Sequence, residues 1–222
     1  MSTNNIDLRI LFEDAHFLAV DKPAGVPSQP DLTGDPSMLE RIAALQETSG
    51  LGPAHRLDRP VSGVLLFGRS EMALRALNGL FRERTVQKTY WAIVEGIAPE
   101  QGRCSALLER SARGRKAVTR QAQSAKEQSH LEFRRLAQGD RFALLEVRPE
   151  GGGFHQIRAL LAAEGLPIKG DVKYGARRGE PDRSIALHAR SLAFQHPFRG
   201  TPVRIEAPEP VRSIWPALLA LR

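Results

Sequence analysis

The chain has 222 residues, of which 41% are hydrophobic, so it can form a sizeable globular core and is not expected to be disordered as a whole. Its formal net charge of +7 bears on binding partners rather than on the fold. Nucleic acid is the first candidate partner and an acidic protein the second, and the alternative is that the charge serves only solubility. The one cysteine, Cys104, excludes an internal disulfide and is consistent with a reducing cytoplasm, and no apolar run approaches the ~18 residues that a transmembrane helix needs.

The first half of the chain predicts four strands and two helices around a loop at 55–63. Apolar and β-branched runs indicate strands at 8–12, 17–20, 64–67 and 88–94. Apolar residues at helical spacing indicate a helix over 37–46 and a second helix from Ser70, its candidate N-cap, to Phe81.

The second half adds strands, a glycine turn and two helices. Further strands are expected at 131–136, 142–147, 184–187, 192–194 and 203–207. Glycines at 151–153 allow a sharp turn or a close approach, and a helix follows over 154–165. His155 and Arg158 lie three residues apart and share a face of that helix, and a last helix is expected over 211–221. At least eight strands with few helices predict an α+β domain whose sheet is mixed and largely antiparallel.

Residues 103–127 differ from their surroundings, because basic side chains crowd this segment and large apolar side chains are scarce. We predict a flexible basic insertion at about 103–127, outside the core. It is either a solvated loop or an arm that binds nucleic-acid phosphates. The candidate phosphate contacts are Arg110, Arg113, Arg115, Lys116 and Arg120.

Asp58 stands between Arg56 and Arg59 in the loop 55–63, directly before the buried strand. A loop held by a core strand is a common place for a reactive side chain. Such a carboxylate can attack an electrophile, abstract a proton or only pair with an arginine. For an isolated Asp between arginines, the last alternative is the better expectation.

Four short motifs stand in order along the chain, and together they favour a reactive Asp58 over one that only pairs with an arginine. They are 20–25, then 55–58 with 62–63, then 88–90, and then 155–158 followed by 170–171 and 174–175. Their ordered combination, with a matching tail at 187–208, resembles the RluA-type family of RNA pseudouridine synthases. The resemblance implies one pseudouridine synthase catalytic domain over 1–222, without the small S4 RNA-binding domain of some relatives. It also implies that the chain isomerises specific uridines in structured rRNA or tRNA.

The resemblance implies a catalytic set of three residues. In this reaction uracil is detached from C1′, turned, and rejoined through C5. Asp58 is the essential carboxylate, either as a nucleophile or as a base at the ribose. Arg158 pairs with Asp58, since a guanidinium binds a carboxylate in a fixed fork. Tyr90 stacks on the uracil ring and assists proton removal from C5.

Four more residues are implied at the substrate. A base inside a stack must be flipped out before it can react, and Arg56 resembles the wedge that fills the vacated position. Ile157 forms an apolar floor beneath the base. His55 packs against the loop and orients it, and Gln156 is the remaining candidate for substrate binding. No cofactor and no metal are implied, and the six histidines show no paired ligand spacing.

Two positions depart from the family pattern. Gly153 stands where relatives usually carry Arg, so a charge near the substrate backbone is missing, and Leu160 stands where many carry His. One alternative is an inactive, basic RNA-binding protein on the same fold, but an intact catalytic set argues against it. Another is a hydrolase that stops after bond cleavage, which would release free uracil. A monomer is the default expectation.

Overall fold

The computed structural model describes residues 8–45, 50–111, 116–120 and 128–222. The strands are β1 (Ile10–Glu13), β2 (Phe17–Lys22), β3 (Gly52–Pro53), β4 (Ser62–Gly68), β5 (Gln87–Glu95), β6 (Gln101–Arg110), β7 (Ala117–Arg120), β8 (Gln128–Gln138), β9 (Phe142–Glu150), β10 (Leu187–Gln195) and β11 (Pro202–Glu206). The helices are α1 (Met38–Leu45), α2 (Glu71–Arg82), α3 (Gln156–Ala163) and α4 (Trp215–Leu219), with a 3-10 turn η2 (Val172–Tyr174). Among the helices of these ranges, none has the length and apolar character that crossing a bilayer requires.

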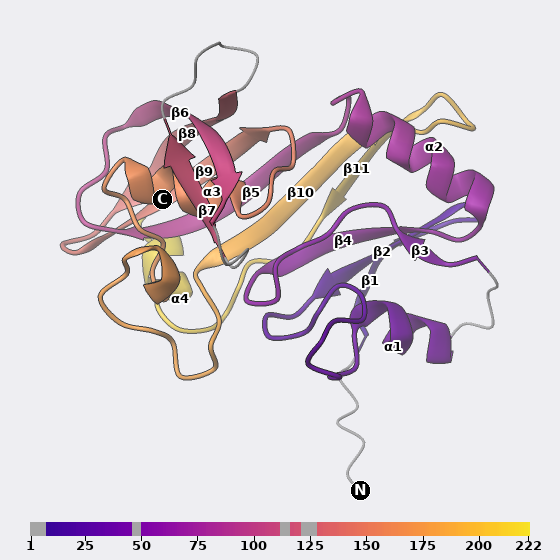
Figure 1. The fold of residues 1–222 in the computed structure, drawn as a ribbon, viewed down its shortest axis with the longest axis horizontal. Coiled ribbons are helices and arrows are strands. Elements are labelled where there is room, and N and C mark those ends of the chain that lie inside the picture. The colour runs from indigo at the N-terminus through magenta and orange to yellow at the C-terminus, as the bar shows by residue number, and fades with distance from the viewer. Residues whose placement is uncertain (1–7, 46–49, 112–115, 121–127) are drawn as a thin grey trace, which may run out of the picture.

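Within the described ranges, eleven strands form one sheet in the order β1-β2-β4-β10-β5-β9-β8-β6-β7, with β3 beside β4 and β11 beside β10. The pairing of β4 with β10 is parallel, and the other paired strands are antiparallel. This confirms the predicted α+β class. In Figure 1, β10 runs through the middle of the molecule, with β1 to β4, α1 and α2 on one side and β8, β9, α3 and α4 on the other.

The apolar run of β4 lacks alternation because helices cover both faces of the sheet at this strand. Leu65 lies in one apolar core with Ile42 of α1, and Leu66 lies in a second core with Leu77 of α2. Both leucines are fully buried. Full burial of a leucine contributes about 1.5–3 kcal/mol, so the strand that follows Asp58 is firmly held.

The prediction of a flexible segment over 103–127 was wrong for its described parts. Residues 103–110 belong to β6 and pair with both β7 and β8. The side chains of Cys104 and Ala117 are buried. Cys104, Ala106 and Leu108 pack at alternate positions toward the core, whereas Arg103 and Arg110 are exposed, so charge masked the strand pattern in the sequence.

Two predictions for the C-terminal part were also wrong. The strands expected at 184–187 and 192–194 are replaced by one strand, β10, which pairs with β4, β5 and β11 and therefore continues through its polar middle. The last helix is confined to α4 rather than extending over 211–221. Ser213 has a left-handed φ of 52°, which is incompatible with a continuous right-handed helix, and Val211 is exposed.

Candidate active site

The backbone on both sides of Asp58 is tied to the segment that follows β2. The Ser28 hydroxyl donates to the Leu57 carbonyl at 2.8 Å and accepts from the Leu57 amide at 3.0 Å. The Gly25 amide donates to the Arg59 carbonyl at 2.8 Å. Two motifs that lie about thirty residues apart thereby form one rigid support for the carboxylate.

The buried side chain of Lys22 also links the same two segments. Its side chain is fully buried, and Nζ donates to the carbonyls of Pro23 at 2.9 Å, Val26 at 2.8 Å and Arg59 at 3.2 Å. Burial lowers the pKa of Lys22 to about 7, although the charge of Asp58 opposes this shift. Lys22 therefore acts as a cross-link beneath the Asp58 loop.

Gly63 lets the Asp58 loop enter the sheet. It has a φ of +111°, and a Cβ at this position would lie 2.2 Å from the carbonyl oxygen of Ala189 on β10. Beside it, the Ser62 hydroxyl lies 2.9 Å from Nδ1 of the buried His188. Any side chain at position 63 would push β4 away from β10 and move the loop with it.

Arg158 joins Asp58 to a second, deeper carboxylate, that of Asp171. Its Nη1 donates to Oδ2 of Asp58 at 2.9 Å, which confirms the predicted pair. Its Nε and Nη2 donate to the two carboxylate oxygens of Asp171 at 2.7 and 2.9 Å. The Asp58 side chain is 26% exposed, whereas those of Arg158 and Asp171 are 6% and 2% exposed. Burial alone would lower the pKa of Arg158, but Asp171 and Asp58 raise it above its ordinary value, so the guanidinium stays charged.

His155 approaches Asp58 as the N-cap of α3, in a left-handed conformation with φ 54°. Its Nε2 lies 3.5 Å from Oδ2 of Asp58, and its Nδ1 lies 2.8 Å from the Tyr174 hydroxyl. The Ala117 amide donates to that hydroxyl at 2.7 Å, so the hydroxyl proton is directed to Nδ1 and the imidazole proton is assigned to Nε2. Burial lowers the pKa of His155 to about 4, despite the charge of Asp58, so the ring is neutral near pH 7.

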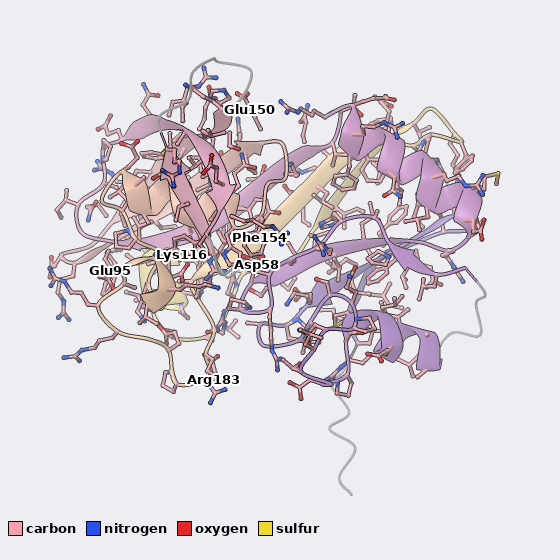
Figure 2. All side chains as sticks on the ribbon, viewed as in Figure 1. Asp58, Glu95, Lys116, Glu150, Phe154 and Arg183 are labelled. Carbon is pink, nitrogen blue, oxygen red and sulfur yellow. The ribbon has the colours of Figure 1, made fainter. Side chains whose placement is uncertain are left out.

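Asp58, His155 and Arg158 line one open cavity of about 1250 Å³. Tyr90 on β5 and the buried Ile157 on α3 belong to its wall, and the exposed Arg56 belongs to its lining as well. Burial, reinforced by the charge of Asp58, raises the pKa of Tyr90 well above its usual range, so its phenol stays protonated. The predicted catalytic set is thus gathered around one cavity, and Figure 2 shows Asp58 at the centre of the molecule.

His55 and Gln156 line the same cavity, but their polar atoms are bonded within the protein. Nε2 of His55 accepts from the Leu66 amide at 3.2 Å, and burial lowers the pKa of His55 to about 3. The Gln156 amide donates to two backbone carbonyls at 2.8 and 2.9 Å and accepts from the Gly153 amide at 2.8 Å. Both residues therefore shape the cavity wall.

The structure describes three of the five basic residues predicted to contact phosphates. The Arg110 guanidinium lies 4.5 Å from the centre of the Phe154 ring and lines the cavity. Arg120 pairs with Glu109 at 2.7 Å across the β6–β7 hairpin, and Lys116 is exposed at the start of β7. The other two, Arg113 and Arg115, lie outside the described residues.

Sequence reasoning did not assign a role to Asp171 or Tyr174, although both belong to recognised motifs. Asp171 follows Arg158 by 13 residues, and only the packing of α3 against η2 brings the two together. One signal was available. An arginine on a buried helix face needs a paired acid, because an uncompensated buried charge is costly.

The comparisons with known proteins identify the family of the chain. Residues 16–163 match the family described as RNA pseudouridylate synthase. Ribosomal large subunit pseudouridine synthase D of Xanthomonas campestris pv. campestris is 34% identical, and the alignment covers 93% of this chain and 67% of the relative. An uncharacterized RNA pseudouridine synthase of Zymomonas mobilis subsp. mobilis is 36% identical, with 91% of this chain and 94% of the relative covered.

A solved structure shares the fold. Human RNA pseudouridylate synthase domain containing 1 superposes with a TM-score of 0.79 at 26% sequence identity, covering 97% of this chain and 87% of the human one. The fold and the cavity therefore define an RNA pseudouridine synthase, an enzyme that isomerises uridine in RNA. The chain belongs to the RluA-type family of these isomerases.

Proposed function

We propose that Asp58 is the catalytic carboxylate with which this isomerase converts uridine in folded RNA to pseudouridine. The observation that carries the proposal is the array Asp58–Arg158–Asp171, in which two buried members hold the third at the cavity. Both described contacts to Asp58 are made at Oδ2, which leaves Oδ1 for the substrate. An ionised carboxylate fixed in this way suits either nucleophilic attack or proton abstraction at the ribose.

The uracil ring would lie between Tyr90 and Ile157 while its bond to C1′ breaks and the C1′–C5 bond forms. The raised pKa of Tyr90 favours a stacking role, because a phenol that stays protonated is a poor base for the proton on C5. Arg56, exposed at the cavity, would fill the space that the flipped uridine leaves in the RNA. His55 and Gln156 would hold the walls rather than touch the base.

Ribosomal RNA is the substrate class we favour, because the Xanthomonas relative is named as a ribosomal large subunit pseudouridine synthase. Transfer RNA is the second candidate. We propose that the enzyme acts as a monomer in the cytoplasm, where both RNAs are made available to it. An inactive RNA-binding protein is disfavoured, since it would have no use for a buried Arg158–Asp171 pair behind a carboxylate that faces RNA phosphates.

Mapping of pseudouridine in total RNA tests this function. We expect at least one rRNA pseudouridine to disappear when the gene is deleted, and to return with the parent enzyme but not with Asp58→Asn. Loss of the carboxylate should reduce tritium release from 5-tritiated uridine by at least about 10²-fold while leaving RNA affinity nearly unchanged. Asp31→Asn is the matched control, because Asp31 also lines the cavity but is exposed and pairs only within its own loop. Normal tritium release by Asp58→Asn would refute the assignment.

We further propose that the reaction needs no metal ion. Among the residues that the structure describes, no group of three or more His, Cys, Asp or Glu is placed to hold one. Enzyme treated with EDTA should therefore retain its turnover on a short RNA stem-loop that folds without divalent cations. Restoration of a lost activity by zinc, with the RNA fold unchanged, would contradict this.

A further inference from the structure

Phe154 and Arg110 form a stacked pair in the cavity that the proposed chemistry does not use. The Phe154 ring stacks on the His155 ring, with centroids 3.9 Å apart and planes inclined by 20°. The Arg110 guanidinium also lies over the Phe154 ring, 4.5 Å from its centroid. Figure 2 labels Phe154 and Asp58 near the centre of the molecule, and both line the cavity that would hold the target uridine.

Neither side chain is needed to fill the interior. The Phe154 ring is half-buried and belongs to neither of the two apolar cores. Arg110 is exposed, and among the described residues no carboxylate lies within ion-pair distance of its guanidinium. Among the described residues, one face of this aromatic ring outside the core carries an exposed cation that a ligand can displace.

The segment before this ring carries no side chains of its own. Residues 151–153 are glycines, and those at 152 and 153 are exposed. The left-handed backbone of His155 turns its ring between Phe154 and Asp58. Conformations of this kind are costly and persist where a site requires them. The local backbone is thus arranged to present Phe154 to the cavity.

We propose that Phe154 is a second base-binding position, on which a nucleobase adjoining the target uridine stacks after displacing the Arg110 guanidinium. This inference rests on the proposed function, because it takes Asp58 as the position of the target. The His155 ring separates the two positions, with contacts of 3.5 Å to Asp58 and 3.9 Å to Phe154. Neighbouring nucleotides of one RNA strand can span such a gap once the target base is turned out of the stack.

Displacement of the Arg110 guanidinium from Phe154 by a base is favoured because each group then makes a stronger interaction. Stacking of a base on an aromatic ring is stronger than an exposed cation–π contact. The displaced Arg110 meets the RNA backbone, where a guanidinium binds phosphate in a fixed fork. Because every base has a π-face, the position binds a neighbour of any sequence and contributes affinity rather than base specificity.

Binding of defined oligonucleotides tests the proposal. The probe is a single-stranded RNA heptamer with one central uridine among adenosines, compared with versions in which the residue on either side of the uridine is abasic. We expect one of the abasic versions to bind the parent enzyme about tenfold more weakly. Phe154→Leu should bind the intact heptamer about tenfold more weakly and should show no further loss with the abasic version. Phe154→Trp, which keeps an aromatic face, should still bind the abasic version more weakly than the intact heptamer. This loss of affinity is the abasic penalty.

Arg110→Gln separates the contribution of the guanidinium to RNA binding from that of the Phe154 ring. It should retain the abasic penalty and flatten the dependence of log affinity on log salt by about 0.7, the value for one phosphate contact to a single strand. Phe198→Leu and Arg204→Gln, whose side chains lie outside the cavity on the β10–β11 hairpin, should match the parent enzyme.

Three outcomes would overturn the proposal. They are parent-like affinity of Phe154→Leu, an undiminished abasic penalty in that variant, and loss of the penalty in Arg110→Gln, which would place the base on the guanidinium instead. Asp58→Asn distinguishes a failure of the proposed function. If that variant still forms pseudouridine but shows the abasic penalty, the catalytic assignment fails and the stacking position stands.

Discussion

At the scale of single residues, the three guanidinium nitrogens of Arg158 donate hydrogen bonds to two different acids. Asp171 binds two of them within the protein, so the third points to Asp58 in a fixed direction. Asp171 is thus a positioning residue, since it meets Arg158 and not the cavity. The same division explains why Arg158 stays charged although it is buried.

We expect Arg158→Met to reduce turnover about 10²-fold, because Asp58 loses both its partner and its orientation, and to leave KM little changed. Asp171→Asn keeps one acceptor for Arg158, so a smaller loss, about tenfold, is expected. Steady-state tritium release from 5-tritiated RNA measures both. Asp182→Asn is the control, since Asp182 pairs with Arg212 away from the cavity. Parent-like turnover by Arg158→Met would show that the pair has no catalytic importance.

At the scale of elements, the β6–β7 hairpin forms part of the site rather than a free arm. Its Arg110 lies on Phe154, and its Ala117 amide donates to the Tyr174 hydroxyl, which contacts His155. A hydrogen-bonded path therefore connects the hairpin backbone to the imidazole that faces Asp58.

Replacement of both Arg110 and Lys116 by Gln should weaken RNA binding and flatten its salt dependence. Each phosphate contact accounts for roughly 0.7 to 0.9 in the slope of log affinity against log salt, so a decrease of about 1.4 to 1.8 is expected. Turnover at saturating RNA should change little. Titrations at several salt concentrations decide the result, with Arg75→Gln and Arg204→Gln as the control pair on α2 and β11. An unchanged slope would mean that the hairpin does not contact phosphates.

At the scale of the whole molecule, buried histidines make stability depend on pH. Burial lowers the pKa of His155 to about 4 and that of His188 to about 3, from the ordinary value of 6.5. In the unfolded chain these rings take up protons as the pH falls below 6.5, while in the folded protein they stay neutral. Their contribution is therefore complete above pH 6.5 and is lost progressively as the pH falls toward 4.

The pKa of His55 is lowered to about 3 as well, so the free energy of unfolding should fall by about 3–4 kcal/mol per pH unit between pH 6 and 4.5 from the three histidines together. Urea unfolding at several pH values measures this slope. His188→Gln should remove about 1.4 kcal/mol per pH unit of it, whatever its effect on stability at pH 7. If the variant and the parent enzyme have the same slope, His188 does take up a proton in the folded state.

Much of the candidate site was predictable from the resemblance to the RluA-type family. The pair formed by Asp58 and Arg158 and the cavity position of Tyr90 followed from ordered motifs, and β4 followed from its apolar run. Asp171 and the Tyr174 contact were not predictable, because nothing in their neighbours along the chain indicates what they meet in space. The described parts of the segment 103–127 were misread because exposed charges obscured the residues that pack against the core.

The sequence by itself determined most of the strands, because periodicity is a property of neighbouring residues, and its ordered motifs supplied the candidate site residues through the family resemblance. Only the tertiary structure decided which groups share the cavity. Asp58 and Arg158 are 100 residues apart, and they meet because β10 lies between β4 and β5. The Phe154–Arg110 pair likewise depends on the packing of β6 beside α3, and long-range packing of this kind is set by the burial of the whole sheet rather than by any short stretch of residues.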